Sequence, residues 1–410
     1  MAKTLDVYLL GDLAGHLVQA DGGDSSFRYT ESWLTKSGAT PLSHSLPLRK
    51  ERFRRKECAG FFKGILPEEG KREIVARNLG ISARNDYAML ERIGGECAGA
   101  VTFLSHGESP PERNYSYRTL SAGELAGILR ELPKRPLLAG EEGVRLSLAG
   151  AQDKIAVRIE EGEVCLPLGG APSTHILKPA VERFEGVVFN ESFCMKLAAA
   201  AGLPAAAVET RNVAGVDYLL VKRYDRDHRL APTGETVMER LHQEDFCQAL
   251  GIVPEHKYQK EGGPSLKQCF ALLRQVSSAP VVDLVRLLDA VVFNYLVGNN
   301  DAHGKNFSLI YRGGVRLAPL YDVVSTVCYP ELTTEMAMRI GTEYSSDRVI
   351  ARDFEQLAEE AGLAKPLVRS RVAEVAERVA ASVSTVEIGH PVAANVAALV
   401  GARAGKVLGR

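Results

Sequence analysis

The stretch from Gly298 to Phe307, with the sequence GNNDAHGKNF, constrains the fold more than any other part of the chain. It follows a long apolar pattern that predicts a helix, and it leads into an apolar run that predicts a strand. Asp301 and Asn306 stand five positions apart in it, and Asp322 follows beyond a predicted hairpin. Asn, Asp and Gly also cap helices and form turns without any chemical role. Asp322, however, lies in an apolar run, where a carboxylate needs a cation or hydrogen-bond donors.

This spacing is the layout of a kinase catalytic loop, D-x-x-x-x-N, followed by a metal-binding aspartate. In such a loop the carboxylate of Asp301 would orient and deprotonate the attacking hydroxyl group. The amide oxygen of Asn306 and the carboxylate of Asp322 would hold a magnesium ion that clamps the phosphates. The combination favours a metal-dependent phosphotransferase over a plain turn.

Length and composition indicate an ordinary globular protein. The 410 residues are enough for two or three domains, and the 45% hydrophobic and 25% charged contents are typical of soluble chains. The net charge of −1 argues against a protein that binds polyanions over its whole surface. The seven cysteines show no C-x-x-C spacing, which predicts free thiols in a reducing cytoplasm rather than a disulfide framework or a zinc site.

No signal peptide or membrane span is expected. The first residues carry Asp6 and Asp12 where the apolar core of a signal peptide would continue. The most apolar stretch, from Val281 to Val297, is interrupted by charged residues. These patterns predict a cytoplasmic protein.

A turn of small residues precedes the first candidate phosphate contact. Ala149, Gly150 and Ala151 lie between two strand-like runs, and a glycine turn between strands can bring backbone N–H groups close to phosphates. It is not a Walker A loop, because Ile155 follows Lys154 where Ser or Thr would be needed. A plain hairpin remains the alternative.

Lys178 ends an apolar strand, as does the phosphate-pairing lysine of kinases. A surface lysine is the commonest alternative. Glu191, near the start of the next predicted helix, is the nearest candidate to hold this lysine. Further on, an apolar run that predicts a buried strand ends in charged residues from Lys222 onward. In a kinase, the hinge that contacts adenine would lie here, although the run could equally be an ordinary core strand. The segment 241–251 and most of the chain after it predict helices.

The chain resembles the HipA family of bacterial serine/threonine kinases, the toxin halves of type II toxin–antitoxin modules. The resemblance covers about residues 145–325 and rests on an ordered set of motifs: SLAGAQDK (147–154), HILKP (175–179), RYDR (223–226), RLHQEDFCQ (240–248), GGP (262–264), NDAHGKNF (300–307) and LYD (320–322). It implies an α+β, two-lobed protein-kinase-like fold. The expected parts are an extra N-terminal α+β subdomain (1–105), the remainder of the β-rich N-terminal lobe (106–228) and an all-helical C-terminal lobe (229–410).

The resemblance also implies roles for individual residues. Asp301 would be catalytic, Asn306 and Asp322 would hold Mg²⁺, and Lys178 would contact the phosphates of ATP. The other ATP-binding residues would be the phosphate loop, the hinge and two residues of the catalytic loop: Ala149, Gly150, Ala151, Gln152, Asp153 and Lys154; Lys222 and Tyr224; and His303 and Lys305. Ser147 would be an inhibitory autophosphorylation site, since a phosphate adds about −1.5 to −2 charges at neutral pH.

The same resemblance implies a substrate and a partner. The substrate would be a serine in a translation protein, such as the glutamyl aminoacyl-tRNA synthetase. The partner would be a small helix-turn-helix antitoxin of the HipB type, through which the chain would meet operator DNA. Two alternatives stay open: a small-molecule kinase, similar to aminoglycoside or sugar phosphotransferases, and a pseudokinase that serves as a corepressor subunit. Against the second, Lys178, Asp301, Asn306 and Asp322 are all present.

Overall fold

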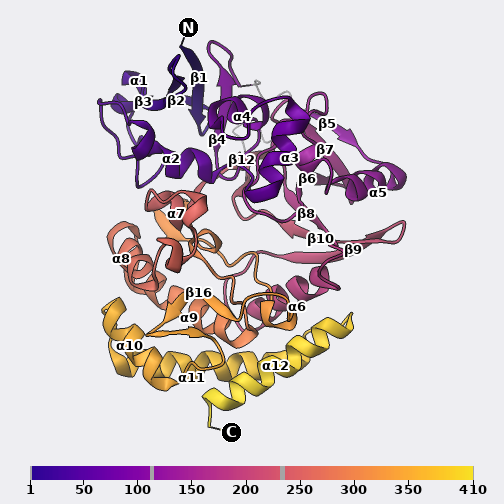
Figure 1. The fold of residues 1–410 in the computed structure, drawn as a ribbon, viewed down its shortest axis with the longest axis vertical. Coiled ribbons are helices and arrows are strands. Elements are labelled where there is room, and N and C mark those ends of the chain that lie inside the picture. The colour runs from indigo at the N-terminus through magenta and orange to yellow at the C-terminus, as the bar shows by residue number, and fades with distance from the viewer. Residues whose placement is uncertain (1, 111–114, 231–235, 410) are drawn as a thin grey trace.

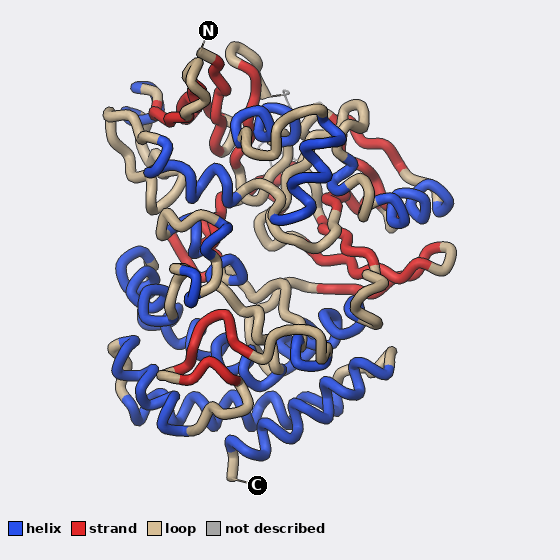
Figure 2. The backbone as a smooth tube through the Cα atoms, in the orientation of Figure 1, coloured by secondary structure: helices blue, strands red, loops and turns tan. Residues whose placement is uncertain are grey.

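The computed structural model describes residues 2–110, 115–230 and 236–409, which form two lobes stacked along the long axis of the molecule (Figure 1). The upper lobe holds both large sheets, and the lower lobe holds most of the long helices (Figure 2). The predicted α+β class with two lobes is confirmed. Among the described residues, no helix is both long and apolar enough to cross a membrane.

The N-terminal part is built on a four-stranded antiparallel sheet of order β3-β2-β1-β4. Alternate residues Leu5, Val7 and Leu9 are fully buried on one face of its central strand. The strands and the helices that follow them are β1 (Lys3–Leu9), β2 (Asp12–Gln19), β3 (Ser25–Tyr29), α1 (Glu31–Thr35), α2 (Arg55–Gly64), α3 (Glu69–Leu79), α4 (Asp86–Ile93) and β4 (Val101–Ser105).

The second sheet has six antiparallel strands in the order β5-β7-β6-β8-β10-β9. Helix α6 is almost wholly buried, because it contacts β9 and β10 above and α11 and α12 below. The elements of this part are β5 (Ser116–Thr119), α5 (Ala122–Glu131), β6 (Ile155–Glu160), β7 (Glu163–Leu168), β8 (His175–Pro179), α6 (Val187–Ala200), β9 (Val208–Val213) and β10 (Val216–Lys222).

One continuous hydrophobic core joins the two sheets. It contains Phe27 and Phe103 from the N-terminal part together with Ile155 and Leu177 from the second sheet. A separate core fills the lower lobe and includes the buried face of α6. The domain boundaries expected near residues 105 and 228 stay a prediction.

The expectation of an all-helical C-terminal lobe is wrong. Its helices are α7 (Phe246–Ala249), α8 (Leu266–Val276), α9 (Pro280–Val297), α10 (Ala351–Ala361), α11 (Lys365–Ser382) and α12 (Pro391–Val407). Between them lie the strands β11 (Arg226–Leu230), β12 (Thr236–Arg240), β13 (His242–Asp245), β14 (Ser308–Tyr311), β15 (Val315–Leu317), β16 (Glu335–Ile340) and β17 (Glu343–Ser345). Strand β13 replaces the first half of the helix expected over 241–251, because it pairs with β14. A short apolar run fits either element until such a distant partner decides.

The N-terminal part rests on the beginning of the C-terminal lobe. The backbone N–H of His44 donates to Glu244 at 2.9 Å, and the Ser43 hydroxyl donates to the same carboxylate. Nearby, the Gln248 side chain donates to the Phe61 carbonyl at 3.1 Å. These contacts involve β13 and α7, which also pack against the catalytic-loop turn at 304–306.

Candidate active site

A lysine ammonium group lies between two carboxylates where the lobes meet. Lys178 Nζ, at the end of β8, is 2.6 Å from Glu191 Oε1 and 2.6 Å from Asp322 Oδ1. Burial alone would lower the pKa of Lys178, but the two carboxylates raise it above its usual range. Burial would raise the pKa of Asp322, but Lys178 holds it below its usual range. Burial raises the pKa of Glu191, so the charged pair that stands out is Lys178 and Asp322. The contacts of Lys178 tie β8, α6 and the C-terminal lobe together at one point.

The backbone at Asp322 is in the left-handed conformation, with φ of +58°. Few residues other than Gly, Asn and Asp adopt it, and such strain is typical of functional positions. The hydroxyl of the preceding Tyr321 donates to the Lys305 carbonyl at 2.6 Å, which holds the segment beside the catalytic loop. The Asp322 side chain is 36% exposed, so a further ligand can reach it.

The catalytic loop begins where α9 stops. Gly298 caps the helix with φ of +71°, and a Cβ there would lie 2.4 Å from the side chain of Val327, so only glycine fits. Asp301 follows and is exposed. Its Oδ1 accepts a hydrogen bond from the Tyr258 hydroxyl at 2.9 Å. This carboxylate is thus oriented and open to an incoming hydroxyl group.

Asn306 and His303 shape the rest of the loop. Asn306 Oδ1 accepts from the His303 N–H at 3.1 Å, which closes a short 3-10 turn. The His303 ring is buried against Tyr258, with ring centroids 5.5 Å apart, and burial lowers its pKa. Its Nδ1 has no hydrogen-bond partner in the described part of the chain. His303 is therefore placed to support both Tyr258 and the turn.

Lys305 connects the catalytic loop to the N-terminal part. Its Nζ lies 2.7 Å from Asp245 Oδ2 and 3.5 Å from Glu68 Oε1, and it donates to the Gly64 carbonyl at 3.2 Å. The other Glu68 oxygen lies 3.0 Å from Lys257 Nζ. The Lys305 ammonium group is thus already occupied by carboxylates and holds the catalytic loop in place. Its expected contact with ATP stays a prediction.

Lys154 stabilises the turn formed by Ala149, Gly150 and Ala151. Gly150 has φ of +106°, and Lys154 Nζ donates to the Ala149 carbonyl at 2.9 Å. Asp153 Oδ1 lies 2.6 Å from Lys71 Nζ of α3, while Ala151 is exposed and Gln152 half-buried. Only the run after the turn is a strand, β6; residues 145–148 make a single bridge instead.

Ser147 is fully buried in this conformation. Its hydroxyl donates to the Ile65 carbonyl at 2.9 Å, and its N–H donates to the Glu96 carbonyl at 2.9 Å. Both polar groups are satisfied inside the protein. A phosphate could be added here only after this segment has moved outward.

The expected hinge lies at the end of β10. The Lys222 side chain is exposed, and the Tyr224 hydroxyl donates to the Gln243 side chain. The ring of Tyr224 lies 5.7 Å from that of Tyr321, next to Asp322. Tyr224 thus lies close to Asp322, the aspartate expected to bind the metal, whereas the Lys222 side chain points to solvent.

A buried charge network stands behind this hinge, and the sequence analysis did not recognise it. Glu96 is fully buried and lies 3.1, 2.7 and 2.6 Å from Arg223, Arg226 and Arg240. Burial would raise the pKa of Glu96, but the three guanidinium groups lower it to about 2. The charged residues at 223–226, directly after a buried strand, were the sequence feature that could have indicated this network. The network fastens the N-terminal part to the hinge.

The residues expected to hold Mg²⁺ fit that ion. Asp322 offers a carboxylate and Asn306 an amide oxygen, and Mg²⁺ prefers a few hard oxygen ligands from the protein together with phosphates and water. The bond between Tyr321 and Lys305 places the two segments side by side. When bound there, the ion would neutralise phosphate charge.

Lys178 lies between Glu191 of α6 and Asp322, whose backbone is strained and whose side chain reaches solvent. Protein kinases use a lysine–glutamate pair of this kind, together with a metal-binding aspartate, to position the nucleotide. With the exposed Asp301 on the loop below, the two lobes define an enzyme of the protein-kinase class.

Comparison with known proteins names the family. The HipA N-terminal domain matches residues 5–104, and the HipA-like C-terminal domain matches residues 146–383. The chain belongs to the HipA family. It is 48% identical over 389 residues to Y4mE of Sinorhizobium fredii, a protein named as a kinase, with 94% of this chain and 92% of that protein covered.

The relative with a more specific name is the serine/threonine-protein kinase toxin HipA of Shewanella oneidensis. The identity is 30% over 405 residues, covering 95% of this chain and 91% of the relative. The solved structure of Shewanella oneidensis HipA with HipB and operator DNA superimposes with a TM-score of 0.86 at 28% identity, covering 99% of this chain and 98% of that chain.

Proposed function

We propose that this chain is an ATP- and Mg²⁺-dependent serine/threonine protein kinase that acts as the toxin of a toxin–antitoxin pair. The observation that carries the proposal is Lys178 held at 2.6 Å from both Glu191 and Asp322. In protein kinases this lysine–glutamate pair must be in place for phosphoryl transfer. The similarity to a named serine/threonine kinase toxin over nearly the whole chain supports the same function.

Each residue has a defined part in this reaction. Asp301 accepts the proton of the substrate hydroxyl, and Tyr258 keeps that carboxylate oriented. Lys178 contacts the phosphates, and the backbone N–H groups of the turn at 149–154 surround them. Asn306 and Asp322 hold Mg²⁺, which supplies charge neutralisation.

The substrate in this proposal is a serine of a translation protein, such as the glutamyl aminoacyl-tRNA synthetase, which would place the reaction in the cytoplasm. The kinase also phosphorylates its own Ser147 and thereby inactivates itself. Because Ser147 is buried, self-phosphorylation needs the segment to open first and is slower than transfer to substrate.

Intact mass after incubation with Mg-ATP tests the kinase and Ser147 together. Wild type is expected to gain one phosphate that maps to Ser147, while Asp301→Asn gains none. Ser147→Ala should gain none either, yet should phosphorylate the synthetase. If Ser147→Ala modifies no protein although it binds Mg-ATP, the protein-kinase proposal is wrong.

The partner proposal concerns a small helix-turn-helix protein, since the similar Shewanella protein was solved with HipB and operator DNA. Co-expression with the helix-turn-helix protein of the same operon should give a complex in size-exclusion chromatography. That complex should bind the operator, and the kinase alone should not. Operator binding by the kinase alone would contradict the proposal.

A further inference from the structure

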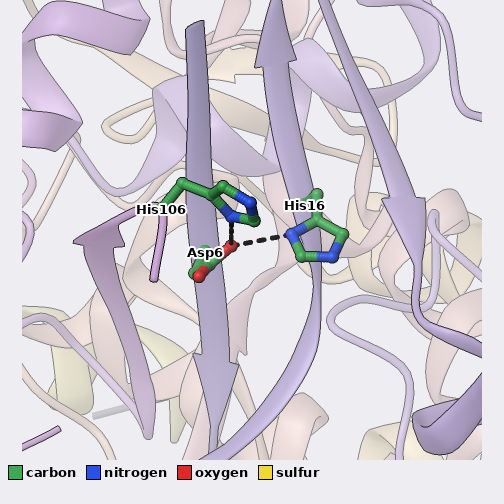
Figure 3. A group of neighbouring side chains, drawn as sticks. All are labelled: Asp6, His16 and His106. Carbon is green, nitrogen blue, oxygen red and sulfur yellow. Dashed lines mark hydrogen bonds and ion pairs between the residues drawn. The ribbon is translucent and has the colours of Figure 1, made fainter. Parts of the chain in front are cut away.

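Three side chains from neighbouring strands meet on the first sheet, outside the kinase site. Asp6 lies on β1 and His16 on β2, where they are direct cross-strand partners. His106 follows the last residue of β4, the strand on the other side of β1. Figure 3 shows both imidazole rings turned toward the Asp6 carboxylate. Three separate backbone segments thus supply one side chain each.

The donor atoms are close enough to share one ion. His16 Nδ1 lies 2.7 Å and His106 Nδ1 2.9 Å from Asp6 Oδ1. One ligand atom from each of the three residues lies within 4.8 Å of the others. The second Asp6 oxygen accepts the Gly107 N–H at 2.9 Å, which fixes the carboxylate. Ligands at about 2.0–2.1 Å from a tetrahedral ion stand roughly 3.3 Å apart, so each Nδ1 atom would have to move away from Asp6 Oδ1 by about half an ångström.

Among the described residues, the Asp6 carboxylate has no permanently charged cation as a partner. Its side chain is 4% exposed, and in the described part of the chain its ion-pair partners are the two histidines, with no Lys or Arg. A carboxylate with so little exposure is costly to keep charged without a cation.

We propose that Asp6, His16 and His106 bind a divalent transition-metal ion, with Zn²⁺ the best match. Two imidazole nitrogens and one carboxylate oxygen suit zinc, and a water would complete its coordination. Mg²⁺ is a poorer match because it prefers oxygen ligands only. On binding, each neutral imidazole carries its proton on Nε2 instead of Nδ1. The His16 and His106 side chains are 33% and 66% exposed, so the ion can enter from solvent.

This site has a structural consequence that differs from kinase chemistry. The ion would join β1, β2 and the segment after β4 through side chains, in addition to the backbone hydrogen bonds of the sheet. The cysteine pattern gave no sign of it, because no cysteine takes part. The competing explanation is a plain hydrogen-bonded cluster in which both histidines donate to Asp6.

Zinc titration of the full chain, stripped with a chelator and kept free of ATP, separates the two explanations. We expect wild type to bind one more equivalent of Zn²⁺ than Asp6→Asn, measured by competition with a chromophoric chelator. His106→Gln should bind that equivalent at least about 100-fold more weakly, since even changes outside the ligand set cost 10- to 100-fold. The exposed His228→Gln is the matched control and should bind as wild type does.

Two further measurements distinguish the loss of the zinc site from misfolding of a variant. Co²⁺ should give wild type and His228→Gln a visible absorption band that His106→Gln lacks, although His106 is too exposed to be needed for folding. Zn²⁺ should raise the melting temperature of wild type but not that of His106→Gln. Equal zinc stoichiometry and affinity in wild type, Asp6→Asn and His106→Gln would overturn the proposal.

Discussion

At the scale of single residues, Asp322 combines two features that proteins usually avoid. Its backbone is left-handed, and its carboxylate is held next to a buried lysine instead of facing solvent alone. Neither feature is needed for packing, since the neighbouring Leu320 and Val323 supply the buried apolar surface. The strain is therefore best explained by the place that this carboxylate must take opposite Lys178.

The variant Asp322→Asn separates the charge from the backbone geometry. Asn also tolerates the left-handed conformation, so the fold should persist while phosphoryl transfer falls at least about 100-fold. In wild type, Mg-ATP should raise the melting temperature more than ATP with EDTA does, and in the variant this difference should disappear. Glu161→Gln, another charge loss at positive φ, is the control and should behave like wild type. A variant that keeps the magnesium effect would remove Asp322 from the metal site.

Sequence spacing was sufficient to single out the candidate catalytic and metal-binding residues, and their roles stay predictions. Asp301, Asn306 and Asp322 follow from the helix stop and the hairpin, and the choice of Glu191 as the partner of Lys178 is confirmed at 2.6 Å. Tyr258 could not be predicted, because a tyrosine in a polar loop carries no signal until the fold brings it to Asp301.

At the scale of elements, the N-terminal part reaches the catalytic loop through the residue before α3. Glu68 is 5% exposed and lies between Lys257 and Lys305, more than 180 positions further along the chain. No local pattern connects residues so far apart, so sequence analysis assigned the N-terminal part no chemistry. The structure makes it a support of the catalytic turn.

Glu68→Gln should therefore slow catalysis although Glu68 itself is not expected to contact the substrate. We expect kcat to fall about tenfold with KM for ATP nearly unchanged, and stability to fall by about 1–3 kcal/mol, because a buried carboxylate that pairs with two lysines loses its charge. Steady-state kinetics and urea unfolding measure the two effects. Glu73→Gln, on the exposed side of α3, is the matched control. A purely structural role would lower stability and leave kcat of the folded enzyme unchanged.

The error at β13 shows what sequence patterns cannot decide. The segment from Leu241 to Gly251 has apolar positions that fit a helix, and its second half is indeed the short helix α7. Its first half becomes a strand because Glu244 and Asp245 pair with Leu309 and Ser308 of β14. The partner strand follows the catalytic loop, so this choice depends on long-range contacts.

At the scale of the whole molecule, the contact between the N-terminal part and the C-terminal lobe contains a titratable group. Glu244 is 1% exposed, and burial raises its pKa to about 7 from an ordinary value of 4.5, although hydrogen bonds from Ser43 and Tyr311 oppose the shift. A raised pKa means that the folded state holds a proton that the unfolded state releases. The stabilisation is thus complete below about pH 4.5 and is lost as the pH rises through about 7.

Glu244→Gln imitates the protonated form and should remove this pH dependence. The variant should match wild type at about pH 5 and exceed it by up to about 3 kcal/mol at pH 8. Urea unfolding at both pH values measures the difference. Glu131→Gln, on an exposed helix face, should change neither value. A variant less stable than wild type at pH 8 would show that the ionised carboxylate is preferred.

The single core beneath both sheets has a consequence for how such proteins can be recombined. Phe27, Phe61 and Phe103 belong to the same buried cluster as Ile155 and Leu177 of the second sheet. Severing the chain between the two sheets would leave each fragment with a large apolar surface open to water and prone to aggregation. Each fragment is therefore expected to depend on the other for its stability.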